Sequence, residues 1–358
     1  MDAGRVSQER IVAIQALRFI AAIAVAGMHA EIFAFWLGQF VGVGLERPAL
    51  AAIGNFGVDL FFVISGFVIV LSSEKLFGKA GAVRTFALRR IIRVVPLYWA
   101  GLLLVLLWSL RFPPAPDWQS MVHAMLFVPY ASNTAHGRIV PPLEVGWTLN
   151  FEMLFYFVVA LAMAKDASAT VRRTAFILFL LVLAGSLLDL PQPLANWSSP
   201  IILELSGGTM LALIYRGGWQ FQPRVRLCAL ALAASLLLSP LVMPGADMSG
   251  WLRVLFWGGG SWLLLAAMVL VPTRSGGSDA RFWNFGGDIS YALYIVHMPV
   301  MMVSQMVWRH FRLPYGATEE AIFVVLVLVM SLVAAVIVHL LFERPLSQWL
   351  RSRVAHIA

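Results

Sequence analysis

The stretch that decides the fold is IVAIQALRFIAAIAVAGMHAEIFAF, residues 11–35. It is long enough and apolar enough to cross the hydrocarbon of a bilayer as one helix, which takes about 20 residues. It carries Arg18 and His29, and no small-residue cleavage site follows a clean apolar core, as a signal peptide would require. The stretch therefore predicts a retained first transmembrane helix.

The rest of the chain repeats this pattern. Of the 358 residues, 60% are hydrophobic and only 12% are charged, and the mean hydropathy is +0.83. A soluble protein of this composition would expose large apolar patches, which soluble monomers rarely tolerate. We therefore predict an all-α, polytopic membrane protein with about ten transmembrane helices. The expected spans lie near 11–35, 56–73, 95–110, 147–164, 174–190, 200–215, 225–243, 252–272, 287–308 and 320–342.

The basic residues predict how these helices are oriented. If the N-terminus lies inside, nineteen of the 26 Lys and Arg residues fall on the cytoplasmic side and six fall outside. Because Lys and Arg are retained on the cytoplasmic side, this asymmetry predicts a cytoplasmic N-terminus. An even number of spans then puts the C-terminus inside as well.

The charge and cysteine content narrow the function classes. The net charge is +8, but the basic residues lie between apolar runs, so we expect contacts with membrane lipids and no nucleic acid. The single cysteine, Cys228, allows no intramolecular disulfide and no cysteine metal cluster. No His, Cys and Asp spacing suggests a metal site. Oligomeric state is left open.

Ionisable residues inside the first helix are the strongest functional signal. Arg18 and His29 are eleven residues apart, so both project from one helix face, about 16 Å apart along the axis. Such residues are costly in a membrane and are functional candidates. Alone, Arg18 could snorkel to headgroups and His29 could make a helix contact. The shared face favours a polar cavity with a cation near its inner mouth and a titratable imidazole further in.

Other polar groups recur at the expected helix ends, each with a structural alternative. Asp59 could cap the second helix, Ser65 and Gly66 could allow close helix packing, and the arginines at 89, 90 and 93 could be a membrane anchor or bind phosphates. Glu152 and Tyr156 share a face, as do Ser290, Tyr294 and His297. The candidates are Asp59, Ser65, Gly66, Arg89, Arg90, Arg93, Trp147, Glu152, Tyr156, Tyr294 and His297.

Five ordered blocks resemble one family. Residues 15–29 resemble its Arg-x10-His first helix, and 57–67 (GVDLFFVISGF) its second-helix signature. Residues 88–99 resemble its basic entry to helix three, 147–156 its W[ST]LxxExxFY motif, and 290–297 its SYxLYxxH motif. Together they are similar to the acyltransferase-3 family, the membrane-bound enzymes that O-acylate bacterial surface and exopolysaccharides. The opening Ile14-Gln15-Ala16-Leu17-Arg18 is similar to the exopolysaccharide-modifying branch.

The resemblance implies a transmembrane domain over residues 10–345, a short cytoplasmic tail over 346–358, and no soluble C-terminal domain. It implies a location in the bacterial inner membrane, with acetyl-CoA or another acyl-CoA as donor and a saccharide, free or lipid-linked, as acceptor. His29 would be the general base, with Glu152 and Arg18 assisting. Coenzyme A would be bound by Arg18, Arg89, Arg90, Arg93, Ser65 and Gly66, and the acceptor by Asp59, Trp147, Tyr156, Tyr294 and His297.

Other functions share a polar lumen. A transporter or flippase of a saccharide would need no thioester, although no internal repeat of the kind many transporters have is visible. A small-molecule glycoside could replace the polysaccharide as acceptor, and a covalent acyl intermediate could replace direct transfer. A structural scaffold would tolerate conservative changes at Arg18 and His29.

Overall fold

A computed structural model describes residues 3–43, 53–131, 138–243, 247–271 and 280–355. Within these ranges all regular structure is helical, which confirms the all-α prediction for the described residues. The long helices are α1 (Ala3–Val41), α3 (Phe56–Ser72), α4 (Ala82–Arg111), α6 (Trp147–Ala162), α7 (Ala167–Leu187), α9 (Ile202–Arg216), α10 (Pro223–Leu237), α12 (Gly259–Val269), α13 (Ala280–His310), α14 (Ala317–Val338) and α15 (Arg344–Ala355). The shorter elements are α5 (Trp118–Met125), η2 (Glu144–Gly146), α8 (Leu194–Trp197), η3 (Ser239–Leu241), α11 (Gly250–Arg253), η4 (Val254–Gly258) and η5 (His339–Glu343).

Seven helical stretches among the described residues are long and apolar enough to cross a membrane. They are Val12–Val41, Ala82–Arg111, Glu144–Ala162, Ala167–Leu187, Gly250–Val269, Ala280–His310 and Ala317–Arg353. The apolar helix α3 is shorter, at 17 residues. Each of the ten segments expected from the sequence overlaps a helix.

Several boundaries differ from the expectation, and the largest difference is at the start of the third segment. The third segment was expected to begin at residue 95, whereas α4 begins at Ala82. Residues 82–94 lack acidic and helix-breaking residues and alternate basic with apolar side chains, so the helix continues through them. The three arginines therefore lie within the helix and not in a loop before it.

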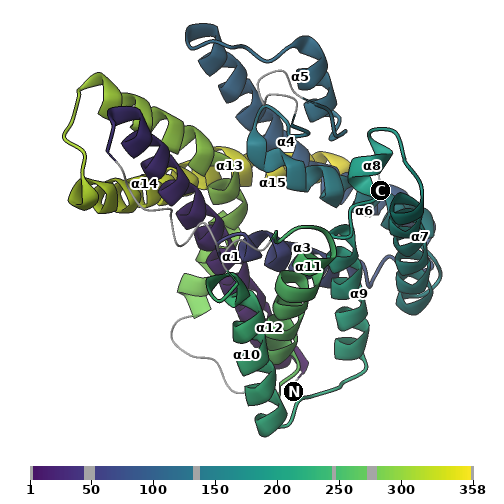
Figure 1. Ribbon diagram of the computed structural model, residues 1–358. Coiled ribbons are helices and arrows are strands. Elements are labelled where there is room, and N and C mark those ends of the chain that lie inside the picture. Colours follow the sequence, from purple (N-terminus) through teal and green to yellow (C-terminus); the bar gives the residue numbers. More distant parts are fainter. Residues whose placement is uncertain (1–2, 44–52, 132–137, 244–246, 272–279, 356–358) are drawn as a thin grey trace.

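The α1 helix is the centre of one half of the molecule. It runs beside α13 and α14, on the left in Figure 1. The face of α1 that carries Gln15 and His29 lies against α13. Two glycines of α13 allow the close approach. A Cβ on Gly286 would lie 2.7 Å from the Phe19 ring, and one on Gly287 would lie 2.5 Å from Gln15. The crossing of α1 and α13 therefore depends on small residues, as is usual between membrane helices.

The α3 and α9 helices form a second tight crossing. A Cβ on Gly66 would overlap the backbone carbonyl of Leu205, and one on Gly208 would overlap that of Val63. Ion pairs join the two ends of α3 to other helices. Asp59, near its start, pairs with Arg253 at 2.9 Å, and Glu74, just past its end, pairs with Arg216 of α9 at 2.9 Å.

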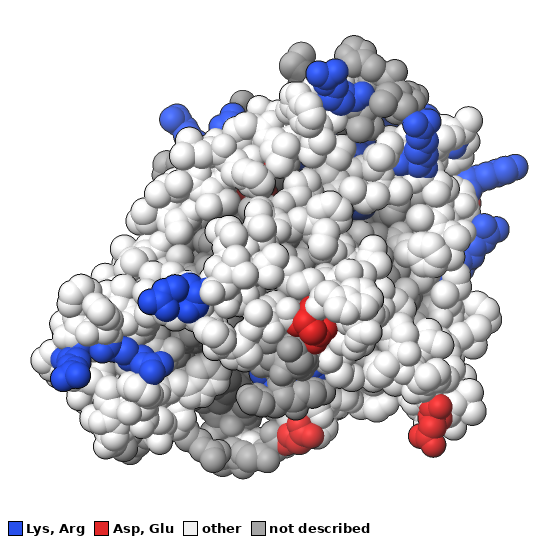
Figure 2. All heavy atoms as spheres, turned by 90° about the horizontal axis from the view of Figure 1, so that it is seen from above, with Lys and Arg blue, Asp and Glu red and all other residues white. Residues whose placement is uncertain are grey.

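The outer surface of the bundle is apolar. Large exposed hydrophobic side chains occur along most long helices, especially α4, α7 and α14. In the space-filling view of Figure 2, most atoms belong to uncharged residues, and the basic side chains gather in separate groups near the margins. A surface of this kind is suited to contact with lipid.

Candidate active site

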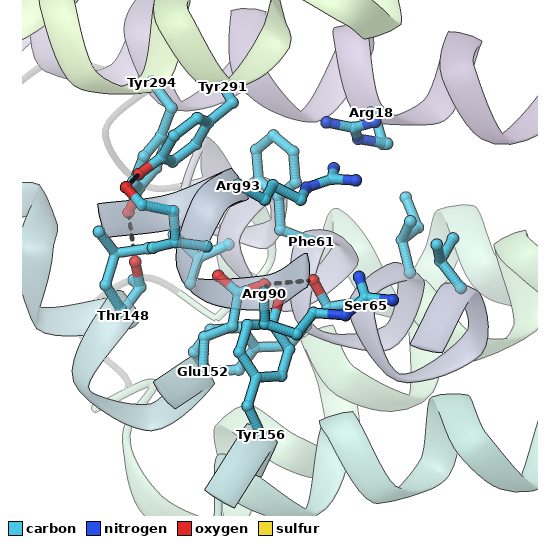
Figure 3. Close-up of a pocket in the computed structure, with 16 residues that line it drawn as sticks. Arg18, Phe61, Ser65, Arg90, Arg93, Thr148, Glu152, Tyr156, Tyr291 and Tyr294 are labelled. Atoms are coloured by element: carbon cyan, nitrogen blue, oxygen red, sulfur yellow. Dashed lines mark hydrogen bonds between the residues drawn. The ribbon is translucent and has the colours of Figure 1, made fainter. Parts of the chain in front are cut away.

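A pocket of about 800 Å³ lies where α1, α3, α4, α6 and α13 meet (Figure 3). Its polar lining comes from all five helices, although these are far apart in the sequence. The lining side chains used below are Arg18, Phe61, Ser65, Arg90, Arg93, Thr148, Glu152, Tyr156, Tyr291 and Tyr294. A second cavity, of about 1170 Å³, shares Arg18 and Val68 with this pocket, so the two adjoin.

Three guanidinium groups converge on the pocket without carboxylate counter-ions. Among the described residues, Arg18, Arg90 and Arg93 form no salt bridge. Arg18 donates to Gln15 Oε1 at 3.0 Å, and Gln15 donates in turn to Asp288 at 3.0 Å. Arg18 is thereby held toward the pocket by a neutral amide, which leaves its charge available to an anion.

Arg90 is the most buried of the three, at 8% exposure. Its Nη2 donates to Ser72 Oγ, and its guanidinium lies over the rings of Phe86 and Tyr156, 5.5 and 5.7 Å from their centroids. Its Nε, however, is buried with no hydrogen-bond partner among the described residues. A buried donor without a partner is costly, so this nitrogen is suited to a ligand oxygen.

Glu152 lies opposite the arginines (Figure 3). Its Oε1 accepts hydrogen bonds from Ser65 Oγ, at 3.0 Å, and from the Tyr156 hydroxyl. These two donors fix the carboxylate at the junction of α3 and α6. The pocket thus combines three cations with one carboxylate, an arrangement suited to a polyanionic ligand that also carries a reacting group.

Tyr294 of α13 also lines the pocket. Its hydroxyl is 2.8 Å from Thr148 Oγ1 and donates to Val145 O at 3.0 Å. Its ring packs edge to face against Phe61, with centroids 5.8 Å apart. On its other side lies His297, whose ring centroid is 6.0 Å away. Tyr294 is therefore a shared wall between the pocket and a histidine pair.

His29 and His297 form this pair. His297 Nε2 lies 3.3 Å from His29 Nδ1, and neither ring lines the pocket itself. His29 Nδ1 donates to Val25 O at 2.9 Å and His297 Nδ1 donates to Leu293 O at 3.0 Å, because carbonyl oxygens only accept. Each neutral ring therefore keeps its lone pair on Nε2. His297 Nε2 accepts from His29, which leaves His29 Nε2 as the basic nitrogen.

Besides the two histidines, four of the sequence candidates lie outside the pocket. Arg89 of α4 is exposed and does not line the pocket, and Gly66 packs against α9. Asp59 is fully buried in its ion pair, with both carboxylate oxygens 2.9 Å from Arg253 nitrogens. Trp147 lies beside the same arginine, and the centroid of its ring is 5.6 Å from the guanidinium carbon of Arg253. Asp59 and Trp147 thus belong to a cluster next to the pocket.

Sequence reasoning missed several partners. Arg253 was counted only as an outer loop charge, and Glu204, which is 4% exposed with both oxygens unpartnered among the described residues, was not noticed. Asp288 was also overlooked. An acidic residue within an apolar segment was the available signal for Glu204 and Asp288. Within the described part of the chain, no three His, Cys, Asp or Glu side chains are grouped to hold a metal ion.

Comparison with known proteins identifies the family. Residues 11–340 match an acyltransferase domain. The chain belongs to the acyltransferase-3 family. It is an acyltransferase, and its relatives place it among the O-acyltransferases. The matched range, residues 11–340, contains the residues that line the pocket and both histidines.

Three curated relatives align over most of this acyltransferase. The chain is 29% identical to the exopolysaccharide production protein ExoZ of Rhizobium meliloti (strain 1021), over 84% of this chain and 92% of that protein. It is 25% identical to the acyltransferase MdmB of Streptomyces mycarofaciens, over 96% and 93%. It is 22% identical to the peptidoglycan O-acetyltransferase OatA of Listeria monocytogenes serovar 1/2a (strain ATCC BAA-679 / EGD-e), over 84% of this chain and 51% of that protein. No solved structure matches the chain.

Proposed function

We propose that this acyltransferase resides in the bacterial inner membrane and moves an acetyl or similar acyl group from cytoplasmic acyl-CoA to a saccharide hydroxyl. The single observation that carries the proposal is the row of polar residues on the face of α1 that packs against α13. This row includes Arg18 and His29, and we call it the α1 seam. Arginines without counter-ions surround one pocket, and a histidine with a free Nε2 lies behind the Tyr294 wall of that pocket.

The proposed topology has ten spans and both termini in the cytoplasm. Besides the seven long apolar helices, α3, α9 and α10 would also cross the membrane. They have 17, 15 and 15 residues and lie within the bundle. Short spans are compatible with local thinning of the bilayer. The two ion pairs of α3 support this alternation, because Arg253 then lies at the outer end and Arg216 at the inner end. The transmembrane domain would occupy residues 10–345, followed by the cytoplasmic tail 346–358.

The donor would enter from the cytoplasm through the cavity that adjoins the pocket at Arg18. Acyl-CoA would supply an activated acyl thioester and several phosphates. Arg18, Arg90 and Arg93 would hold the phosphates, and the unpartnered Nε of Arg90 fits such a role. Ser65 and Glu152 would position the donor near the junction of α3 and α6. For Arg89 and Gly66 we propose surface and helix-packing roles instead.

His29 would act as the general base. Its Nε2 would take the proton of the acceptor hydroxyl as that oxygen bonds to the thioester carbonyl carbon and the carbon–sulfur bond breaks; the departing thiolate then takes up a proton. His297 Nε2, together with Val25 O, would keep the proton on His29 Nδ1, so that Nε2 stays basic. Arg18 would stabilise the negative charge that develops on the carbonyl oxygen of the thioester, and Glu152 would help to orient or tune the base.

The acceptor class is proposed from the relatives. ExoZ is named for exopolysaccharide production and OatA for peptidoglycan O-acetylation, so an extracellular polysaccharide or its precursor is the acceptor class that we propose here. Tyr294, which lines the pocket, and His297 and Trp147, which lie beside it, would contact such an acceptor.

The test has two parts. First, ester groups on the host's polysaccharides would be compared by NMR with and without the gene, and the gene should be required for one class of ester. Second, purified protein in nanodiscs would be given acetyl-CoA and the polysaccharide that lost its ester. Free coenzyme A should appear only when acceptor is present. Transport without thioester consumption would contradict the proposal and favour a flippase.

A further inference from the structure

A third cavity, of about 960 Å³, lies at the far end of the α1 seam from Arg18. Phe40 of α1 follows His29 by eleven residues, so Arg18, His29 and Phe40 share one face of α1 at intervals of about 16 Å. On α13 the cavity lining begins at Met302, five residues after His297, or about 8 Å along the axis. The cavity is therefore the next space along the seam beyond the histidine pair.

The lining combines aromatic rings with cations. The residues that bear on the argument are Phe40, Trp108, Phe112, Gln305, Arg309 and His310. The guanidinium carbon of Arg309 lies 3.5 Å from the centroid of the Phe40 ring, and the Trp108 and Phe112 rings lie 4.5 Å apart. Gln305 bridges the two helices by donating to Phe33 O at 3.4 Å. No acidic side chain of the described residues lines this cavity.

The charges here are unusual for the side of the membrane they occupy. In the proposed topology this end faces outward, where few arginines are expected. Of the outer arginines in the described part of the chain, Arg138 pairs with Glu144 and Arg253 pairs with Asp59. Those that remain, Arg111, Arg309 and Arg312, form no salt bridge with a described residue. Arg309 lines the cavity, and Arg111 lies over Phe112, which also lines it.

Aromatic residues at a membrane interface need no ligand by themselves. A guanidinium stacked on an aromatic ring, beside further rings and an amide and around a hollow space, is a different arrangement. Flat aromatic faces bind the apolar faces of sugar rings, whereas a guanidinium binds carboxylate or phosphate through paired hydrogen bonds. The combination selects a ligand that carries both a sugar ring and a negative charge.

We propose that this cavity, which we call the outer aromatic cavity, binds the acceptor and that the acceptor is an anionic saccharide. Arg309 would bind its charged group, and Phe40 with Trp108 would stack on its sugar rings. This inference rests on the proposed acyltransferase function and deepens it. The negative charge could come from an acidic sugar or from the phosphates of a lipid carrier, and both have the same chemistry for Arg309.

Binding to purified protein in nanodiscs of zwitterionic lipid tests the proposal. The probes are a hexagalacturonate, as the acidic oligosaccharide, and maltohexaose, as the neutral control. The acidic probe should bind at least about tenfold more tightly than the neutral one, since a charged hydrogen-bonded pair contributes this much or more. Arg309→Gln should remove this preference, and Phe40→Leu should weaken both probes. Arg138→Gln, an equal loss of charge outside the cavity, should change neither.

A long-chain polyprenyl diphosphate added to the nanodiscs distinguishes the two sources of charge. If it displaces hexagalacturonate from the wild type, but has no effect in Arg309→Gln, the cavity recognises the carrier phosphates; if it does not compete, the cavity recognises the acidic sugar. Equal affinity for acidic and neutral probes, binding of neither, or unchanged binding in Arg309→Gln would overturn the proposal.

Coenzyme A release from acetyl-CoA, measured on the same preparations, separates this inference from the function it rests on. If binding depends on Arg309 but the wild type shows no acceptor-dependent release, the proposed role of the cavity stands and the proposed acyltransferase mechanism is contradicted. If release is unchanged in Arg309→Gln at every acceptor concentration, the proposed mechanism stands and the proposed role of the cavity is contradicted. We expect Arg309→Gln to raise KM for the acceptor by about tenfold while KM for acetyl-CoA stays constant.

Discussion

At the scale of single residues, the His29–His297 pair is the most informative contact. Both rings donate from Nδ1 to a carbonyl of their own helix, so the direction of the hydrogen bond between them is fixed. His297 takes the place that a carboxylate holds in a Ser-His-Asp triad, where an acceptor orients the base and fixes its tautomer. Unlike a carboxylate, it can do so without bringing a permanent charge into the membrane.

This arrangement predicts different outcomes for two substitutions of His297. His297→Leu removes one of the two acceptors that share the His29 Nδ1 hydrogen and should lower kcat by at least about tenfold, because Val25 O alone would then hold the ring in its orientation and tautomer. His297→Gln keeps an oxygen that can accept and should recover part of the rate. KM for acetyl-CoA should be the same in both, since His297 lies outside the donor pocket. Equal losses in the two variants, or a change confined to KM, would mean that His297 only packs.

The arginine cluster offers a matched pair of variants. Arg93 lines the pocket, whereas Arg89, one turn earlier on α4, is exposed and does not line it. Arg93→Gln should raise KM for acetyl-CoA by about tenfold or more, the effect expected for a lost charged hydrogen bond. Arg89→Gln removes the same charge and should change KM less than about twofold, because an exposed charge is screened by salt. Steady-state kinetics in nanodiscs would measure both, and equal effects would contradict the assignment.

The sequence predicted which types of residue matter better than it predicted which residues meet. Arg18, Ser65, Arg90, Arg93, Glu152, Tyr156 and Tyr294 were all singled out, and they line one pocket. The pairing of His297 with His29 could not be predicted, because it depends on how α1 and α13 cross. Arg89 and Arg93 were grouped by their spacing, but the surroundings of α4 expose one and bury the other more deeply.

At the scale of secondary-structure elements, the bundle depends on a few glycines where helices cross. The crossing of α3 with α9 needs both Gly66 and Gly208, since each meets the backbone of the other helix. Sequence alone suggested close packing at Gly66 but gave no partner for it, because small residues are common in every membrane helix. This crossing matters for the site, since Ser65, next to Gly66, holds Glu152.

Two alanine substitutions test this role of glycine. Gly66→Ala would force the Cβ against the Leu205 carbonyl and should cost about 1–3 kcal/mol, the usual penalty of overpacking. Gly27→Ala, in the middle of α1, meets nothing within 4 Å and should stabilise the protein by about 0.5–1 kcal/mol. Thermal unfolding of the two variants in the same detergent should shift in opposite directions. A Gly66→Ala protein as stable as Gly27→Ala would exclude a tight crossing.

For the whole molecule, the proposed mechanism depends on the orientation of the protein in the membrane, because the proposed donor and the proposed acceptor would reach opposite ends of the α1 seam. Arg18 and the cavity beside it must face the cytoplasm, and Phe40 with Arg309 must face outward. Hydropathy and charge predicted the helices and this orientation before any contact was known. They could not predict the cavities, which form only where side chains of several helices leave a gap.

Single-cysteine labelling tests the orientation. In a Cys228→Ser background, Arg312→Cys should react with a membrane-impermeant maleimide on intact spheroplasts, because residue 312 follows α13 on the side that the proposed topology places outside. Lys165→Cys, between α6 and α7, should react only after permeabilisation. Both positions are in connections between helices, so substitutions there should have little effect on stability. The reverse pattern would invert the molecule and place the donor pocket on the wrong side.

The central claim is that His29 removes a proton from a saccharide hydroxyl as an acyl group leaves coenzyme A. The most direct measurement is acceptor-dependent release of coenzyme A, with NMR detection of the new ester, for wild type and His29→Ala in matched nanodiscs. Both proteins should insert and bind acetyl-CoA equally well, because His29 lies outside the donor pocket. We predict that His29→Ala loses about a hundredfold or more in rate. An equally stable His29→Ala protein that forms the ester at the wild-type rate would contradict the account.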